Sequence, residues 1–255
     1  MSTQADKDDA QPILPLLVDL AGVSCAISTR HGGISQPPYA SLNLGRSTRD
    51  EASALAHNRR VFADAAGFEL DQAARIHQVH GSRVVPVTRP GSFGRADGLV
   101  TARAGLALVI TVADCLPVFL YDPAAGIIGA VHAGWRGILL GVLEQAVESA
   151  VALGARPSGL QVAIGPSIGP CCFEVGPEVA GRFPGSLRQA EGGRQHVDLR
   201  QAAARRLQAS GVPETGIRLP AHCTRCHTRL FFSARSGEPT GRMAGMIIRR
   251  HEPAA

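Results

Sequence analysis

Short apolar blocks separated by polar loops run along most of the chain. Two of them, residues 109–112 and 127–131, are rich in β-branched side chains and are typical of buried strands. Similar runs predict strands at residues 16–28, 74–79, 84–87, 160–164, 217–219 and 241–249, and at the end of segment 222–234. Because the first two runs lead directly into polar clusters, we expect reactive side chains on loops held by a rigid sheet.

Helical spacing of apolar residues occurs between these strands. It predicts helices at residues 50–66, 138–153, 177–183 and 198–210. The second of these has apolar residues at 139, 140, 143, 147 and 150 and ends at Gly154, while Asp198 is a natural N-cap for the last. Strands and helices that do not alternate strictly predict a layered α/β or α+β architecture.

Composition places the chain among globular proteins. Its 255 residues include 45% hydrophobic and 18% charged residues, enough to bury a substantial core. No internal repeat or clear linker divides it, so we expect a disordered tail at residues 1–11 and a single catalytic domain at 12–255. Asp19, Asp114 and Asp122 interrupt the longest apolar stretches, which argues against a membrane span. The acidic N-terminus lacks the basic start of a secretory signal, so we expect a cytoplasmic protein, either a monomer or a small homo-oligomer.

The net charge of +5 raises the question of nucleic-acid binding. Basic residues are scattered and aromatic residues make up only 4%, so we expect no nucleic-acid partner, only moderate attraction to small anions. Lys7 is the single lysine and lies in the predicted tail, which argues against Schiff-base chemistry.

Three side chains at strand ends are candidate metal ligands. His80, Cys115 and His132 each follow or end an apolar strand beside small residues. Zinc in an open site commonly takes three protein ligands from separate elements and leaves one position free. Residue type alone also allows a buried histidine or cysteine of the core, and His77 is an alternative ligand.

The turn after residue 131 is a candidate anion site. Gly134-Trp-Arg-Gly137 directly precedes a predicted helix, so backbone amides and the Arg136 guanidinium could receive a phosphate or carboxylate. The alternative is that both glycines only shape a tight turn and that Arg136 is solvated.

Carboxylates near these loops are candidates for proton transfer. They are Asp97, Asp114 and Glu174, each beside a glycine-bearing loop or a proposed ligand. Asp114 could instead orient a metal ligand from behind.

The segment HCTRCH at residues 222–227 matches two metal motifs. Cys223, Cys226 and His227 fit the C-x-x-C-H pattern of haem attachment, and the two cysteines could be half of a zinc knuckle. A knuckle needs a second tight pair, and adjacent Cys171 and Cys172 are a poor substitute for one. We therefore expect only a structural or peripheral role for Cys223.

A set of motifs occurs in order along most of the chain. They are TRHGGIS and PYASLNLG near the start, QVHG from Gln78, ADGLVT from Ala96, ADCLPV from Ala113, HAGWRG from His132, IGPSIGPCCFEVG from Ile164, and FFSAR with TGRMAG near the end. This set resembles the YfiH or DUF152 family, also labelled the laccase-domain or polyphenol oxidase family and associated with purine nucleoside phosphorylase activity. Segment 222–227 matches the family only at Cys223 and Thr224.

The resemblance implies a fold and an activity. The fold is a four-layer α/β/β/α sandwich, with two mixed sheets face to face and helices outside. The activity is phosphorolysis of adenosine, inosine and methylthioadenosine, with purine nucleosides and phosphate as substrates, together with adenosine deamination.

The resemblance also implies site residues. It makes His80, Cys115 and His132 zinc ligands, leaves His77 outside the matching core, and makes Arg30 and Asn43 candidate pocket residues. With the anion-binding turn, the expected site contains catalytic residues Cys115, His132, Arg136 and Asp114 and substrate-binding residues Arg30, Asn43, Gly134 and Gly137.

Three other functions compete with this one. A multicopper oxidase usually has H-x-H pairs, and the nine histidines here form none, although one cysteine and two histidines could bind copper. A cysteine hydrolase would use Cys115 as nucleophile and His132 as base, and could act in the peptidoglycan editing to which family members have been linked. A metal-stabilised binding module would show no turnover.

Overall fold

The described part of the chain forms two six-stranded sheets. A computed structural model describes residues 11–16, 22–237 and 239–251, so most of the predicted tail and residues 17–21 of the first predicted strand lie outside it. The first sheet has the order β1 (Ile13–Pro15), β2 (Val23–Ser28), β15 (Met243–Arg249), β7 (Ala107–Val112), β3 (Ala73–His77) and β5 (Gly91–Arg95). It is mixed, because β3 pairs parallel with both β5 and β7 whereas the other pairs are antiparallel.

The second sheet carries the most deeply buried strands. Its order is β14 (Ile217–Arg218), β10 (Gln161–Ile164), β8 (Leu116–Asp122), β9 (Ile127–Ala133), β6 (Gly98–Thr101) and β4 (Val84–Pro86). Every residue of β8 and β9 is buried, as expected for central strands covered on both faces. This sheet is also mixed, with parallel pairs at its two edges.

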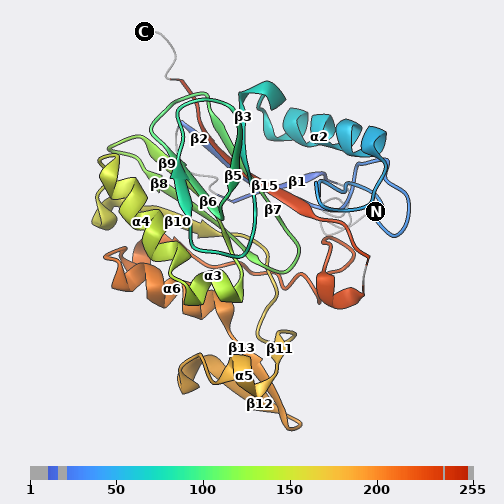
Figure 1. The fold of residues 1–255 in the computed structure, drawn as a ribbon, viewed down its shortest axis with the longest axis vertical. Coiled ribbons are helices and arrows are strands. Elements are labelled where there is room, and N and C mark those ends of the chain that lie inside the picture. Colours follow the sequence, from blue (N-terminus) through green and yellow to red (C-terminus); the bar gives the residue numbers. More distant parts are fainter. Residues whose placement is uncertain (1–10, 17–21, 238, 252–255) are drawn as a thin grey trace, which may run out of the picture.

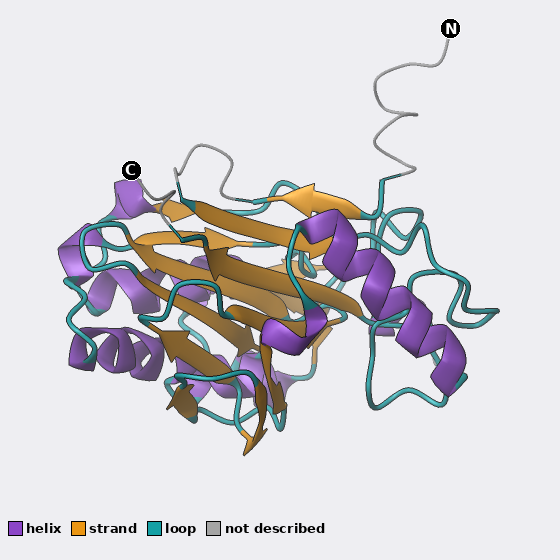
Figure 2. Cartoon of the chain, turned by 90° about the horizontal axis from the view of Figure 1, so that it is seen from above, coloured by secondary structure: helices purple, strands orange, loops and turns teal. Residues whose placement is uncertain are grey.

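Helices cover the outer faces of the two sheets (Figures 1 and 2). Helix α2 (Ala52–Ala66) packs on the first sheet through its apolar face and ends at Gly67, which has the left-handed φ of 71°. Helices α3 (Trp135–Leu139), α4 (Val142–Ala152) and α6 (Leu199–Ala209) lie on the second sheet, where Asp198 caps α6 as predicted.

One apolar core lies between the two sheets. Its fully buried members come from both, and include Leu99, Leu108, Phe119, Ile128 and Ile247. Each sheet also forms a core with the helices that cover its outer face. The predicted four-layer α/β/β/α sandwich of mixed sheets is therefore confirmed.

A small third sheet projects from the body at the lower end of Figure 1. It consists of β11 (Glu174–Val175), β13 (Arg194–Val197) and β12 (Arg188–Glu191), with α5 (Pro177–Ala180) beside it. Short 3-10 segments complete the fold at η1 (Leu70–Gln72), η2 (Pro157–Gly159), η3 (Gly185–Leu187), η4 (Glu214–Gly216) and η5 (Ala234–Ser236).

Several predicted elements need correction. The helix expected at 138–153 is two helices, α3 and α4, because the chain breaks at Gly141 with a φ of 86°. The strand expected within 222–234 is a series of turns, and the helix at 177–183 is only the short α5. Strand β8, which joins the two predicted strands at 109–112 and 127–131, was not predicted.

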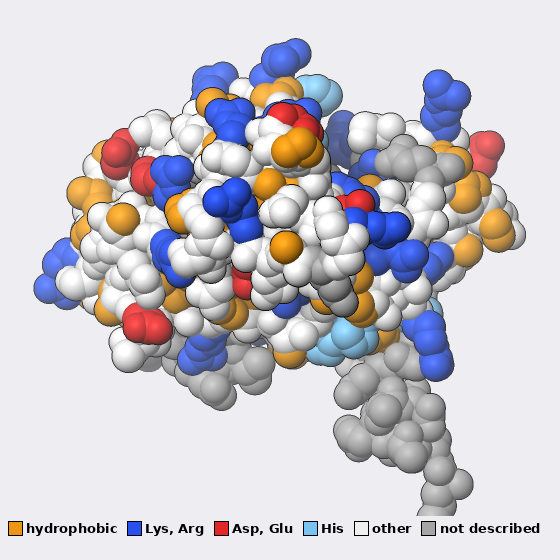
Figure 3. All heavy atoms as spheres, turned by 90° about the horizontal axis from the view of Figure 1, so that it is seen from below, with side chains coloured by type: hydrophobic (Ala, Val, Ile, Leu, Met, Phe, Trp, Pro, Cys, Tyr) orange, Lys and Arg blue, Asp and Glu red, His pale blue; other side chains and the backbone are white. Residues whose placement is uncertain are grey.

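Two surface properties concern possible partners. Among the described residues, no helix is long and apolar enough to cross a membrane. Figure 3 shows basic side chains scattered over one face of the molecule rather than gathered in a single patch.

Candidate metal centre

Strand pairing brings Cys115 and His132 together. Leu116, the first residue of β8, pairs with Ala133, and Pro117 pairs with His132 in the antiparallel β8–β9 hairpin. Cys115 directly precedes β8 and therefore lies beside His132 at the open end of this hairpin. The sheet register thus positions two candidate ligands that are 17 residues apart in the sequence.

His80 reaches the same place from a strained loop that follows β3. Its φ of 59° is left-handed, a backbone conformation that is energetically unfavourable for residues other than glycine. Asp97 holds the loop, since its carboxylate accepts hydrogen bonds from the backbone N–H groups of Val79, His80 (2.9 Å) and Gly81 (2.7 Å).

Asp97 also orients His132. It is fully buried, and its Oδ1 atom lies 2.9 Å from Nδ1 of His132. With Nδ1–H donating to Asp97, Nε2 of His132 is the atom left for a metal. Burial alone would raise the pKa of Asp97, but hydrogen bonds from His132 and from the Gly81 and His80 amides lower it, so this carboxylate stays ionised.

The three side chains form a compact group, which we call the histidine–cysteine centre. One ligand atom each from His80, Cys115 and His132 lie within 4.8 Å of one another. His132 is buried, Cys115 is half-buried and His80 is exposed, so the centre is open on the His80 side. This graded exposure suits a site that must admit a substrate.

The charge state of the centre suits a divalent cation. Burial alone would raise the pKa of the Cys115 thiol, but His132 and His80 lower it to about 6. Burial alone would lower the pKa of His132, but Cys115 and Asp97 raise it to about 9. A thiolate therefore lies beside an imidazolium at neutral pH, and a cation binding there would displace the imidazolium proton.

The remaining expected catalytic carboxylate, Asp114, faces away from the ligands. Its side chain accepts hydrogen bonds from Thr224 Oγ1 (2.6 Å), Ser233 Oγ (3.0 Å) and the Arg235 amide (3.0 Å). Its own φ of 78° makes it the second of the two non-glycine residues with positive φ in the described chain. Asp114 thus fixes the strained turn before Cys115, and the orienting role considered for it belongs to Asp97.

Comparison with known proteins agrees with this architecture. The family model described as multi-copper polyphenol oxidoreductase laccase matches residues 24–250. The chain belongs to this family. Its fold also matches the crystal structure of YfiH from Bacillus licheniformis, with a TM-score of 0.89 and 30% identity over 94% of this chain and 97% of that one. The predicted resemblance to the YfiH family is therefore confirmed.

Curated relatives of the family share most of their length with this chain. The purine nucleoside phosphorylase of Deinococcus radiodurans is 42% identical, covering 92% of this chain and 93% of the relative. The purine nucleoside phosphorylase YlmD of Geobacillus stearothermophilus is 37% identical, covering 91% and 92%.

Although the family description names copper, the donor set does not select one metal. One thiolate and two imidazoles with an open position suit catalytic zinc, and the same set occurs around blue copper. Multicopper chemistry needs several copper ions, and the other candidate metal group among the described residues contains only cysteines. The geometry therefore supports a single-ion centre at His80, Cys115 and His132.

The glycines of the family's HAGWRG turn have a packing role. A Cβ atom on Gly134 would lie 3.0 Å from Sγ of Cys115 and 3.2 Å from Cδ2 of His80, and one on Gly137 would lie 3.0 Å from the Gly81 carbonyl oxygen. Both glycines thus let the turn approach the ligand loops closely. Arg136 is exposed, with its guanidinium 4.5 Å from the centre of the Trp135 ring.

The two expected pocket residues are engaged within the protein. Asn43 is fully buried; its amide donates to Thr48 and Asp50 and accepts from the Gly45 and Arg242 amides. Arg30 donates to the carbonyl oxygens of residues 40 and 228 and lies over the Phe232 ring. Both side chains therefore fix loops, and the sequence alone did not indicate these internal contacts.

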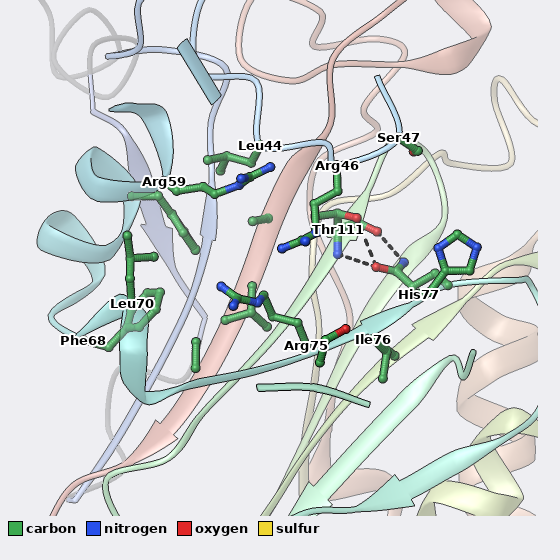
Figure 4. Close-up of a pocket in the computed structure, with 16 residues that line it drawn as sticks. Leu44, Arg46, Ser47, Arg59, Phe68, Leu70, Arg75, Ile76, His77 and Thr111 are labelled. Carbon is green, nitrogen blue, oxygen red and sulfur yellow. Dashed lines mark hydrogen bonds between the residues drawn. The ribbon is translucent and has the colours of Figure 1, made fainter. Parts of the chain in front are cut away.

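An arginine-lined cavity of roughly 380 Å³ opens between α2 and the first sheet (Figure 4). Arg46, Arg59 and Arg75 point into it, and none of its described lining residues is acidic. Burial, and then Arg46 and Arg75, lower the pKa of Arg59. Gln78, two residues before His80, also lines the cavity and bonds to Thr111. His77 lies here too, outside the histidine–cysteine centre.

The structure supplies the second cysteine pair that the sequence did not indicate, whereas the structural or peripheral role expected for Cys223 stays a prediction. Cys171 and Cys172 lie next to Cys223 and Cys226, although about 50 residues separate the two pairs in sequence. His227 is not part of this group; its Nδ1 atom instead contacts the Cys223 carbonyl oxygen at 2.9 Å. Glu174, the third carboxylate considered, forms an exposed ion pair with Arg194.

Proposed function

We propose that the chain is a zinc-dependent purine nucleoside phosphorylase acting on adenosine, inosine and methylthioadenosine, with additional adenosine deaminase activity. The observation that carries the proposal is the histidine–cysteine centre, with three ligands, an orienting carboxylate and one exposed side. Likeness over nearly the whole length to relatives named purine nucleoside phosphorylase supports the reaction.

The reaction exchanges one bond for another at the ribose. A phosphate oxygen forms a bond to C1′ as the bond from C1′ to the purine nitrogen breaks. The products are the sugar 1-phosphate, which is ribose 1-phosphate from adenosine or inosine and methylthioribose 1-phosphate from methylthioadenosine, and the free base, whose nitrogen takes up a proton. His80, Cys115 and His132 would hold zinc, which when bound supplies Lewis acidity at the open side of the centre.

Other residues position these groups. Asp97 fixes the tautomer and ring orientation of His132 and ties down the backbone of the His80 loop. Gly134 leaves room for the ligand side chains, and the exposed Arg136 offers a forked donor to phosphate beside them. Arg30 and Asn43 would support the substrate pocket indirectly, because their hydrogen bonds fix nearby loops.

The test is a product analysis with purified protein. Inosine, adenosine and methylthioadenosine are each incubated with and without phosphate, and base, sugar 1-phosphate and deaminated nucleoside are quantified. We expect base and sugar phosphate in equal amounts and only when phosphate is present, and inosine from adenosine in either case. Base release that does not need phosphate would show a hydrolase instead.

Arginine variants locate the phosphate. Losing one charge-assisted contact costs about 1.5–3 kcal/mol, so Arg136→Ala should raise the KM for phosphate roughly 10-fold or more. Arg59→Gln tests the arginine-lined cavity, and Arg60→Gln, exposed on the same helix, is its matched control. If only Arg59→Gln raises the KM for phosphate, phosphate binds in the arginine-lined cavity and not at the turn.

One observation favours a second candidate, a cysteine hydrolase, which could act on peptidoglycan precursors. The thiolate of Cys115 beside the His132 imidazolium is the arrangement that such enzymes use. Alkylation of protein with and without bound metal separates the two functions: a ligand thiolate is protected by the metal, whereas a nucleophile reacts in both. Metal analysis and the absence or presence of an intense blue colour decide between zinc and copper.

A further inference from the structure

A second group of metal-ligating side chains lies outside the histidine–cysteine centre. We call it the four-cysteine cluster: Cys171, Cys172, Cys223 and Cys226. Its four sulfur atoms all lie within 4.8 Å of one another. We propose that this cluster binds one zinc ion as a closed, structural site.

The sulfur spacing matches a single tetrahedral ion. With zinc–sulfur bonds of about 2.3 Å, tetrahedral geometry places sulfur atoms about 3.8 Å apart. Sγ of Cys226 lies 3.6 Å from Sγ of Cys171 and 3.4 Å from Sγ of Cys172. A disulfide needs about 2.05 Å, and the six cysteines of the chain are free thiols in the structure. The thiols of an iron–sulfur cluster are divided among two or four irons, so those bound to different irons would be spaced more widely.

The turn at Cys223 to Cys226 is built to hold a thiolate. Its C-x-x-C spacing is that of a zinc knuckle. The Gly169 amide donates to Sγ of Cys223 at 3.2 Å, and the amides of Arg225 and Cys226 are directed at the same sulfur. Three N–H donors around one sulfur stabilise negative charge, as outer hydrogen bonds do around metal-bound thiolates.

The two cysteine-bearing loops are already fixed against each other. Arg200 of α6 donates to the carbonyl oxygens of Ser167 and His222, both at 2.6 Å. Ser167 and Cys223 also form a parallel β-bridge. A Cβ atom on Gly169 would lie 3.2 Å from Sγ of Cys171, so the glycine lets the two loops pack closely here. The protein thus presents the sulfur atoms from a preformed scaffold.

The location suggests what the ion would stabilise. Cys171 and Cys172 precede β11, where the chain enters the small third sheet (Figure 1). Thr224, next to Cys223, donates to Asp114, which fixes the turn before Cys115. An ion in the four-cysteine cluster would therefore secure both the base of the projecting sheet and the rear of the histidine–cysteine centre. Because four thiolates complete a tetrahedron, no position remains for a substrate.

The test counts metal ions in protein purified under reducing conditions. Elemental analysis should find two zinc ions per chain in the wild type and one in Cys226→Ser. Cys25→Ser, at a buried cysteine of β2 far from the cluster in sequence, is the matched control and should keep two. The Cys115→Ala variant should also bind one zinc ion, the one in the four-cysteine cluster. The metal content of the cluster is therefore measured independently of the phosphorylase proposal.

Cobalt substitution of the Cys115→Ala variant provides a second measurement, to which a thiolate at the histidine–cysteine centre cannot contribute. Cobalt bound to four thiolates gives strong sulfur-to-metal charge-transfer absorption, and a thiol-blocking reagent should release the ion and abolish it. The proposal is overturned if Cys226→Ser and the wild type hold equal amounts of metal, or if Cys115→Ala removes all of it. It is equally overturned if the cluster holds iron with acid-labile sulfide, or a disulfide despite the reductant.

Discussion

The histidine–cysteine centre and the four-cysteine cluster differ in how they assemble their ligands. The first takes single residues from three places, the loop after β3 and the two sides of the β8–β9 hairpin, and remains open at His80. The second takes two close pairs from two loops and presents four thiols. Three ligands with an open side suit chemistry, whereas four thiolates suit a structural ion.

The surroundings of the two sites reinforce the difference. The centre is held by a buried carboxylate and by two strained residues, His80 and Asp114. The cluster is held by backbone amides, Arg200 and an unstrained turn. Strain is typical of functional sites, where the surrounding structure maintains an unfavourable conformation. Removing a ligand should therefore affect turnover at the centre and stability at the cluster.

The largest expected effect is on turnover at the histidine–cysteine centre. Cys115→Ala removes a proposed ligand from a half-buried position. Changing only a residue that orients a ligand lowers activity by up to roughly 100-fold, so loss of the ligand itself should lower the rate of phosphorolysis by more than that. The variant should keep its fold and unfold in one cooperative transition, because Cys115 lies outside β8. Turnover of inosine and thermal unfolding, measured on the same sample, check both parts. Full activity in this variant would exclude the site.

Stability should respond at the four-cysteine cluster. A ligand present at about 1,000 times its Kd stabilises a protein by about 4 kcal/mol, so Cys226→Ser should lower the free energy of unfolding by about that amount. Denaturant unfolding of this variant and of the control Cys25→Ser measures the difference. Equal stability of Cys226→Ser and the wild type would contradict a structural ion.

Asp97→Asn should have an intermediate effect confined to the centre. The amide keeps the volume but loses one of the acceptor oxygens that serve His132 and the amides of the His80 loop. We expect metal affinity and turnover to fall about 10- to 100-fold. Competition with a chelator measures the affinity, and Asp64→Asn, exposed on α2, is the control. A change in the four-cysteine ion instead would show that the two sites are not separate.

The smallest expected effect lies at the opposite end of the β8–β9 hairpin. The Asp122 carboxylate accepts from the amides of Ala124, Ala125 and Arg156 at 2.8–3.0 Å. Burial alone would raise the pKa of Asp122, but these hydrogen bonds lower it below its usual value. Asp122→Asn should cost about 1.5 kcal/mol at neutral pH and leave both metal contents unchanged.

The pH dependence gives the sign of this contribution. A lowered pKa in the folded state means that the stabilisation is present above about pH 4, the usual range for Asp, and is lost as the pH falls through the folded pKa. As the pH falls, the free energy of unfolding should therefore decrease more for the wild type than for Asp122→Asn. If the free energy of unfolding depends on pH in the same way for both proteins, the lower stability of Asp122→Asn comes from lost packing and not from the ionised carboxylate.

Much of the fold could be predicted from the sequence because strand burial leaves a local pattern. The apolar runs that became β7, β9 and β10 and the capped helix α6 follow directly from side-chain periodicity. Strand β8 was missed because Pro117 lies inside its apolar run, and a proline there argues against a central strand. The break at Gly141 was missed because one glycine does not usually divide an apolar helix.

The candidate site was only partly predictable for a different reason. His80, Cys115 and His132 stood out by residue type and motif, and the structure brings them together. The part played by Asp97 depends on the pairing of β6 with β9, which places its carboxylate beside His132. The four-cysteine cluster depends on a contact between loops more than 50 residues apart, which spacing along the chain does not reveal.

The most direct test of a catalytic zinc at the histidine–cysteine centre is the rate of ribose 1-phosphate formation from inosine as zinc is removed and returned. We predict that chelation abolishes the rate, that added zinc restores it in the wild type, and that Cys115→Ala does not recover. Formation of ribose 1-phosphate at the full rate by zinc-free protein would contradict this assignment.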